Sequence, residues 1–284
     1  MSSRDTPFRF IFLADTQLGC YATFSGFDQA QVEEYAAKGM VVEPVPLVEG
    51  FEWDARQYRR AVEIINHHRP AFVVIGGDLI DDANSEDQTN EFLSITATID
   101  DEIPVRWVPG NHDIAYDAVV PTRESIDAYR EVFGDDYYSF RFEGALFIAL
   151  NTTVIDHPEE VPGEWERQFG FFADEVETAR RVGVEHIVLL GHHPLFLERA
   201  GEADNYWNLP QERRSLLLEV IHRAGVRIGF AGHWHRNSIG YDGDFVQVTS
   251  GPVGYPLGLD PSGYRMVVVG GEGVEHEYRA LEDG

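Results

Sequence analysis

The sequence contains one cysteine, one lysine and no long apolar run. With Cys20 alone, no disulfide can form within the chain, which is typical of a reducing compartment. No stretch approaches the ~18–20 apolar residues that a membrane-spanning helix requires. Residues 1–7 lack the basic and then apolar pattern of a signal peptide. We therefore expect a cytoplasmic protein with no membrane partner.

Basic side chains are scarce, and Lys38 is the only lysine. The 22 Lys and Arg residues face 49 Asp and Glu residues, so the formal net charge is −27. A chain this acidic lacks the positive surface that binds nucleic acid or anionic lipid, so we expect no nucleic-acid partner. A phosphorylated substrate is still compatible with this charge, because a bound metal ion overrides the global field locally.

Apolar runs typical of strands alternate with amphipathic helical patterns along most of the chain. Helical spacing covers residues 53–68, 89–99, 125–133, 163–182 and 211–224. Strand-like runs cover residues 8–14, 72–75, 105–108, 137–141, 145–151, 187–190, 226–230, 245–249, 265–269 and 274–281. This alternation, followed by a strand-rich end, predicts an α/β fold with mixed sheets. No repeat or linker interrupts it, so we expect a single domain over residues 1–284.

Two segments, residues 20–52 and residues 198–210, break this alternation. Loops of this length usually act in binding or are disordered. Both segments begin close to polar clusters, so we expect them to form the rim of a pocket. Their aromatic side chains could stack on a base or pack against the protein, and packing is the commoner outcome. These side chains are Tyr21, Phe24, Tyr206 and Trp207.

Five short polar clusters, each at the end of an apolar run, are the most informative feature. They read Asp15-Thr16-Gln17, Gly77-Asp78 with Asp81, Gly110-Asn111-His112-Asp113, Gly191-His192-His193 and Gly232-His233-Trp234-His235. Strands that end at one edge of a sheet would bring these side chains into one pocket. Carboxylate, amide and imidazole groups are the ligands of divalent metal ions. One such cluster arises easily by chance, but five in order predict a metal-dependent hydrolase.

Hydrolysis of a phosphate ester is assisted by two divalent ions ~3.5–4 Å apart, which clamp the phosphoryl group and lower the pKa of a bridging water. Asp78 is the natural bridging ligand, because it lies between the other clusters in sequence and offers two oxygens. His233 and His235 are two residues apart, so in an extended segment both would point into the pocket. The remaining ligands form two half-sites: Asp15, Gln17 and His235, and Asn111, His192 and His233.

His112 is expected to act in catalysis rather than to bind metal. A free imidazole at this position can protonate the leaving alkoxide or bind a phosphate oxygen. Asp81 is placed to accept the other ring N–H of His112, which would fix the tautomer and favour the imidazolium. Arg236 could contact a phosphate oxygen or carry surface charge. His193 precedes a proline, so we expect it to be structural.

With these residues named, the chain resembles the calcineurin-like metallophosphoesterases. The family pattern is D-x-H, G-D-x-x-D, G-N-H-D/E, a G-H and G-H-x-H, and the match spans about residues 8–236. The resemblance implies two packed mixed β-sheets flanked by helices, a dinuclear metal centre at the strand ends and phosphoester hydrolysis. Gln17 stands where the family usually has His. A Gln oxygen suits Mn²⁺ or Mg²⁺ better than Zn²⁺ or Fe, so the identity of the two divalent ions (Mn, Fe, Zn or Mg) is open.

The Asp-x-Gln variant resembles the subfamily of calcineurin-like phosphoesterase domain-containing protein 1, as do residues 133–140, 193–198, 224–227 and 232–237. This resemblance implies a phosphomonoesterase that acts on phosphoserine or phosphothreonine in proteins. Two alternatives stay open. A cyclic-nucleotide or other phosphodiesterase would use the same ligands, and a binding scaffold that has lost activity would lack ligands or the acid. Only one ligand is changed here, which argues against the scaffold.

Overall fold

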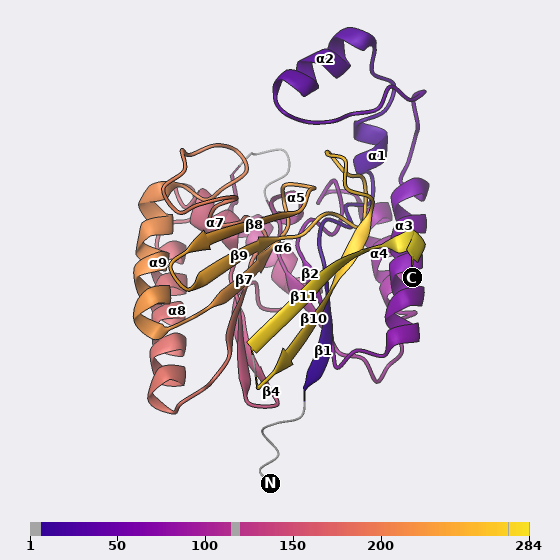
Figure 1. The fold of residues 1–284 in the computed structure, drawn as a ribbon. Coiled ribbons are helices and arrows are strands. Elements are labelled where there is room, and N and C mark those ends of the chain that lie inside the picture. Colours follow the sequence, from indigo (N-terminus) through magenta and orange to yellow (C-terminus); the bar gives the residue numbers. More distant parts are fainter. Residues whose placement is uncertain (1–6, 115–119, 272, 284) are drawn as a thin grey trace.

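The computed structural model describes residues 7–114, 120–271 and 273–283, and it contains two mixed β-sheets that pack face to face (Figure 1). The first sheet has the strand order β11-β10-β1-β2-β3. Its strands are β1 (Phe8–Leu13), β2 (Val73–Gly76), β3 (Val105–Val108), β10 (Gly263–Gly270) and β11 (Gly273–Ala280). β1, β2 and β3 are parallel, whereas β10 runs antiparallel to both β1 and β11.

The second sheet has the strand order β4-β5-β6-β7-β9-β8. Its strands are β4 (Tyr138–Phe142), β5 (Ala145–Ala149), β6 (Ile187–Leu190), β7 (Ile228–Ala231), β8 (Ser238–Asp242) and β9 (Phe245–Thr249). The four central strands are parallel, and β4 and β8 pair antiparallel at the two edges. In both sheets, the loops at the carboxyl ends of the parallel strands are in a position to carry a site.

Helices cover the outer faces of both sheets (Figure 1). Helices α3 (Glu52–His68) and α4 (Glu86–Thr96) pack on the first sheet, and α8 (Glu164–Arg181) and α9 (Gln211–Ala224) pack on the second. The others are α1 (Cys20–Thr23), α2 (Gln29–Ala37), α5 (Asn111–Ile114), α6 (Arg123–Phe133), α7 (Thr152–Asp156) and the short 3₁₀ helix Leu281–Asp283. In the part of the chain that the structure describes, no helix combines the length and apolar character needed to cross a membrane.

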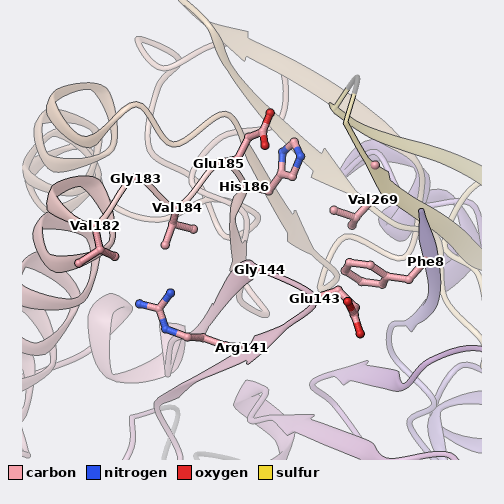
Figure 2. A pocket seen from close by; sticks show the side chains of 11 residues that line it. Phe8, Arg141, Glu143, Gly144, Val182, Gly183, Val184, Glu185, His186 and Val269 are labelled. Atoms are coloured by element: carbon pink, nitrogen blue, oxygen red, sulfur yellow. The ribbon is translucent and has the colours of Figure 1, made fainter. Parts of the chain in front are cut away.

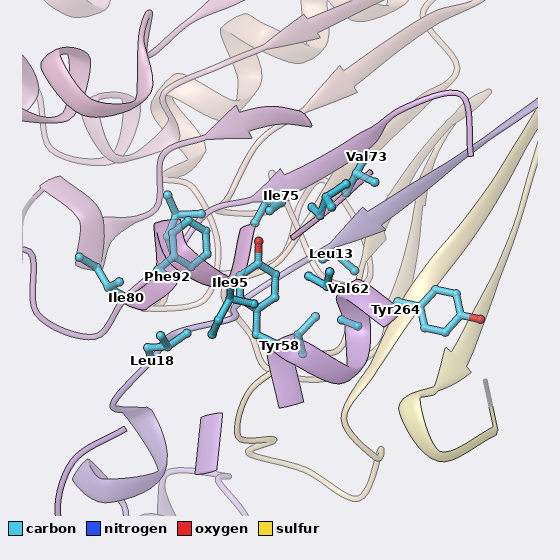
Figure 3. Packing of buried hydrophobic residues seen from close by; sticks show 14 of the residues in the cluster. Leu13, Leu18, Tyr58, Val62, Val73, Ile75, Ile80, Phe92, Ile95 and Tyr264 are labelled. Atoms are coloured by element: carbon cyan, nitrogen blue, oxygen red, sulfur yellow. The ribbon is translucent and has the colours of Figure 1, made fainter. Parts of the chain in front are cut away.

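Strand β1 sends alternate side chains into two separate cores, because successive residues of a strand point to opposite faces. Phe10 lies between the sheets, where its ring stacks on Phe72 with 4.9 Å between centroids. Leu13 points the other way, toward α3 and α4, where Tyr58 stacks on Phe92 at 5.0 Å (Figure 3). The strand that carries the first polar cluster is thus packed on both faces.

The predicted α/β class with two packed mixed sheets is confirmed. Strand β8 was not predicted, because its outward side chains Ile239 and Tyr241 are 45% and 61% exposed and leave no apolar run. Helix α2 was not predicted either. It has no buried residue, and Asp28 and Gln31 begin it with a capping box. The capping box is a local signal for the start of α2, but the helix has no apolar stripe from which its length could be predicted.

A groove of about 240 Å³ lies at the edge where the parallel strands begin (Figure 2). The turn at Glu143 and Gly144 and the loop of residues 182–186 form two of its sides. No group of three or more metal-ligating side chains lies there among the described residues. The groups of Asp and His side chains that could hold a metal ion lie at the opposite edge, where these strands end.

The aromatic layer between the sheets predicts a large loss of stability on truncation. Phe147 is fully buried, and its ring lies 4.8–5.5 Å from those of Phe10, Phe72 and Phe140. We expect Phe147→Ala to lower the free energy of unfolding by about 3–5 kcal/mol, because it opens a cavity that the neighbouring rings cannot fill. Urea unfolding followed by circular dichroism measures this change. Leu259→Ala, at a side chain 92% exposed, is the control and should change it by less than about 0.5 kcal/mol.

Candidate functional site

The polar clusters lie where parallel strands of the two sheets end. In the first sheet Asp15 follows β1, Asp78 follows β2, and Asn111 opens α5 after β3. In the second sheet His192 follows β6 and His233 follows β7. Since these strands end at one edge of the sandwich, both sheets deliver their polar side chains to the same place.

The candidate ligands form two groups of three buried side chains, with ligand atoms within 4.8 Å of one another in each group. One group is Asp78, His192 and His233, and the other is Asp15, Asp78 and His235. Asp78 Oδ2 lies 3.1 Å from His192 Nε2, and Asp15 Oδ1 lies 3.5 Å from His235 Nε2. Asp78 is shared, as the sequence analysis expects of a bridging ligand. The role of these side chains as metal ligands stays a prediction.

Each of the three histidines donates one ring N–H to a main-chain carbonyl. The donors are His192 Nδ1 to Gly76 (3.0 Å), His235 Nδ1 to Tyr255 (2.6 Å) and His233 Nε2 to Tyr206 (2.8 Å). A carbonyl only accepts, so the proton sits on the nitrogen that faces it. The other nitrogen of each ring faces the cluster, which is how metal-binding histidines are held.

Two amide side chains extend these groups with oxygen atoms. Gln17 Nε2 donates to Asp81 Oδ1 at 2.9 Å, and Gln17 Oε1 is buried without a hydrogen-bond partner among the described residues. Asn111 Oδ1 lies 3.2 Å from His192 Nε2, on the side of Asp78. A buried amide oxygen without a donor is costly unless a cation or water meets it. The orphaned Gln17 oxygen therefore fits a divalent ion at this position.

The charges of the cluster also favour cations. Asp15 and Asp78 are almost fully buried, and neither forms an ion pair with Arg or Lys in the part of the chain described. Burial is the main cause that raises the pKa of Asp15. Burial also acts to raise the pKa of Asp78, but the charges of His192 and His112 outweigh it and hold that pKa well below the usual range. Burial would lower the pKa of His192, yet Asp78 raises it to about 9, so positive charge is stabilised beside this carboxylate.

The backbone that presents the ligands is strained. Among non-glycine residues of the described ranges, seven have a left-handed φ, and five of these are candidate ligands: Asp15 (50°), Gln17 (32°), Asp78 (49°), His233 (70°) and His235 (52°). Such conformations cost of order 1–3 kcal/mol each and gather at functional sites. The expected extended segment at His233 and His235 is wrong. The chain turns tightly there, with the Trp234 N–H donating to the Gly232 carbonyl at 2.8 Å.

The Asp113 carboxylate accepts hydrogen bonds from two of the loops that carry candidate ligands. Its Oδ1 accepts the Leu79 N–H at 2.9 Å, and its Oδ2 accepts the Gly110 N–H at 2.7 Å. Gly110 has no room for a side chain, because a Cβ would lie 2.1 Å from Asp78 Oδ1. Within four residues, this cluster contains a glycine that lets Asp78 approach closely, the candidate ligand Asn111, and an aspartate that holds two loops by hydrogen bonds.

Two further braces carry no signal in the sequence. Asp54 in α3 accepts the N–H groups of Gly19 (3.1 Å) and Tyr21 (3.3 Å), which fixes the turn after Gln17. Thr152 Oγ1 accepts the His192 N–H at 3.1 Å. Both residues are far along the chain from the loops that they hold, so only the tertiary structure reveals them.

His112 lies at the cluster with its side chain 24% exposed. Its Nδ1 is 2.7 Å from the main-chain oxygen of Asp81 and 3.5 Å from the carboxylate Oδ1. The expected partner is therefore corrected from the carboxylate to the carbonyl of the same residue, because the carboxylate is engaged by Gln17 and Thr23. Burial would lower the pKa of His112, but the charges of Asp78 and Asp81 outweigh it and raise that pKa.

Arg236 has a different role from the two considered in the sequence analysis. Its Nε donates to the Leu257 carbonyl at 2.7 Å, and its Nη2 donates to the Gly39 carbonyl. Its guanidinium also lies 5.1 Å from the centre of the Trp234 ring. Arg236 therefore fastens residues 20–52 to the body of the protein, and it is not among the residues that line the pocket.

Two other side chains near the site pack rather than face the pocket. His193 is buried, its Nδ1 lies 3.0 Å from Thr152 Oγ1, and its ring centroid lies 4.2 Å from that of His233. Cys20 is fully buried in a small apolar cluster, and burial raises the pKa of its thiol well above the usual value. Both thus have structural surroundings, and neither offers an accessible nucleophile.

The cluster opens into a pocket of about 210 Å³. Its polar lining consists of Gln17, Asp78, His112, His233 and His235. Helices α1 and α2 stand above this edge of the sheets (Figure 1). The remaining lining residues come largely from the segments of residues 20–52 and 198–210. These residues are Phe24, Tyr35, Met40, Tyr206, Trp207 and Leu257. Tyr21 instead stacks on Trp53 at 4.6 Å, so it packs against the protein.

Comparison with known proteins agrees with this geometry. Residues 8–237 match the family described as Calcineurin-like phosphoesterase. The chain is 34% identical over 286 residues to Serine/threonine-protein phosphatase CPPED1 of Homo sapiens, covering 98% of this chain and 85% of the relative, and 31% identical over 284 residues to that of Danio rerio, covering 97% and 85%. A dimetal phosphatase structure from Danio rerio shares the fold, with a TM-score of 0.68 at 16% identity over 96% of each chain. The chain belongs to the calcineurin-like phosphoesterases and is accordingly a metal-dependent hydrolase of phosphate esters.

Proposed function

We propose that this protein is a phosphomonoesterase that uses two divalent ions to remove phosphate from phosphoserine or phosphothreonine in proteins. The main support is the pair of ligand groups that share Asp78, because two ions on a common carboxylate can bind one phosphoryl group together. The protein substrate is proposed from the relatives, which are named serine/threonine-protein phosphatases.

The proposed ligands divide between two half-sites around Asp78. They are Asp15, Gln17 and His235 on one side, and Asn111, His192 and His233 on the other. When bound, the two ions supply positive charge to the phosphoryl oxygens and lower the pKa of a water nucleophile. Of Mn, Fe, Zn and Mg, we propose Mn²⁺, because the amide oxygens of Gln17 and Asn111 are hard ligands.

His112 is proposed as the general acid. Its Nδ1 faces a carbonyl, so this nitrogen carries a proton and Nε2 is the one that can exchange a proton with the substrate. Burial acts to lower the pKa of His112, but the charges of Asp78 and Asp81 raise it, which favours the imidazolium form. Protonation of the leaving serine or threonine oxygen by Nε2 would then assist cleavage of the P–O bond.

The pocket favours a small phosphorylated side chain over a nucleotide. Its volume of about 210 Å³ is below the ~300–1,000 Å³ typical of sites that enclose a drug-sized ligand. The remainder of a protein substrate would lie outside it, against the rim. We propose a single cytoplasmic domain over residues 1–284, in which residues 20–52 and 198–210 form that rim.

A comparison of model substrates tests the proposed function. We expect the Mn²⁺-loaded protein to hydrolyse p-nitrophenyl phosphate faster than bis-p-nitrophenyl phosphate, to release phosphate from phosphoserine or phosphothreonine peptides, and to lose both activities with a chelator. Preference for the diester would favour the phosphodiesterase. Absence of metal-dependent turnover of every substrate would favour the binding scaffold.

Removal of His112 should affect chemistry but not metal binding. We expect His112→Ala to lower kcat by about 10²–10⁴-fold and to leave the metal content unchanged. In the wild type, activity should fall as the pH rises through the pKa of His112, because the active form is protonated, and the variant should lose this limb of the pH profile. His222→Ala, at an exposed histidine that contacts Asp242, is the control and should retain both activity and profile.

Removal of the shared carboxylate should affect both ions. We expect wild-type protein to retain two ions per chain after dialysis and Asp78→Asn to lose both, as measured by inductively coupled plasma mass spectrometry. Asp82→Asn is the matched control, because it removes a charge four residues away, on a side chain that accepts the Asn84 N–H within its own turn. Two ions retained by Asp78→Asn would rule out the bridging assignment.

A further inference from the structure

The segment of residues 198–210 reaches over the candidate metal centre through Tyr206. The main-chain oxygen of Tyr206 accepts the His233 Nε2–H at 2.8 Å, and its ring centroid lies 4.9 Å from that of His233. Trp207 packs edge-on against the Tyr206 ring at 4.8 Å. Although held at these points, Tyr206 is 63% exposed and lines the pocket. Its side chain therefore borders the space that a substrate would enter.

Burial raises the pKa of the Tyr206 hydroxyl, and the Asn111 side chain beside it acts to lower that pKa. The Asn111 oxygen lies beside His192 Nε2, so the amide nitrogen is the atom left to face Tyr206. An amide nitrogen only donates, so the phenolic oxygen can accept from Asn111 while its own proton stays available. Among the described residues, none accepts that proton.

The pocket has few donors for a phosphate group. No Lys or Arg lines it among the described residues, and Arg236 is engaged by the carbonyls of Leu257 and Gly39. A phosphoryl group has three terminal oxygens, which protein sites meet with N–H and O–H donors or cations. His112 is proposed to serve the leaving oxygen, so its proton does not meet a terminal one.

We propose that Tyr206 is a further catalytic residue, whose hydroxyl donates a hydrogen bond to a terminal oxygen of the phosphoryl group. This inference rests on the proposed function and extends it to a contact supplied by the rim. The same hydroxyl lies beside the Asn111 side chain, whose oxygen is 3.2 Å from His192 Nε2. Tyr206 thus joins the substrate to a candidate ligand through one oxygen atom.

Tyr206→Phe removes this oxygen and keeps the ring that packs on His233. We expect kcat/KM for p-nitrophenyl phosphate to fall about 10- to 100-fold, because one donor to the developing charge is lost. The dissociation constant of inorganic phosphate, measured by calorimetry on the Mn²⁺-loaded protein, should rise about 10-fold, while the metal content stays unchanged. Tyr241→Phe is the matched control, because Tyr241 is 61% exposed on β8 and is not among the lining residues of the pocket.

Two results would overturn this inference. Unchanged phosphate affinity and kcat/KM in Tyr206→Phe would show that the hydroxyl does not touch the phosphoryl group. Loss of metal from the variant would show that the hydroxyl serves only to orient Asn111. Wild-type turnover in the same assays separates this inference from the proposed function. If wild type fails to hydrolyse any monoester, the proposed function fails, whereas phosphate binding still reports on Tyr206.

Discussion

Burial of two carboxylates with no Arg or Lys partner among the described residues is the constraint on which the site depends. Asp15 and Asp78 lie at 0% and 2% exposure, at the ends of neighbouring parallel strands. Burying such charges is expensive, and the groups that lower their pKa are histidines and, for Asp15, also the main-chain N–H of His233. The fold holds this arrangement by packing β1 and β2 on both faces and by strained turns after each strand. The stability of the sandwich thus keeps both carboxylates buried at this edge of the sheets.

The amide side chains of Gln17 and Asn111, both candidate ligands, each have a neighbouring polar side chain. Gln17 Nε2 donates to Asp81, which leaves the Gln17 oxygen for a ligand group, and the Asn111 side chain lies beside the Tyr206 hydroxyl while its oxygen is 3.2 Å from His192 Nε2. An amide offers an oxygen and a nitrogen of nearly equal size, and only a fixed acceptor for the nitrogen selects which one faces an ion. Where the family usually has His, Gln17 therefore works together with Asp81, which explains why that carboxylate is not free to hold His112.

Much of this could be predicted from the sequence, because strands end where apolar runs end. The positions of Asp15, Asp78 and the histidines follow from that rule and from the parallel order of the strands. What could not be predicted depends on contacts between distant segments or on backbone turns. The left-handed turn at His233 and the binding of Arg236 to carbonyls of residues 39 and 257 leave no periodic pattern. Edge strand β8 and helix α2 were missed because neither buries an apolar face.

The rim segments are bonded to the ligand loops themselves, so substrate seating and ligand geometry are coupled. Residues 20–52 are held by Arg236, the residue directly after His235, while the Tyr206 carbonyl holds the ring of His233. A substrate that displaced either segment would disturb the histidine beside it. Because main-chain carbonyls make these bonds, side chains of the rim can vary without breaking them. Changes in the rim side chains can therefore alter which substrates bind while the candidate ligands at the floor of the pocket stay in place. The Tyr206 hydroxyl belongs to the rim and lies beside the candidate ligand Asn111.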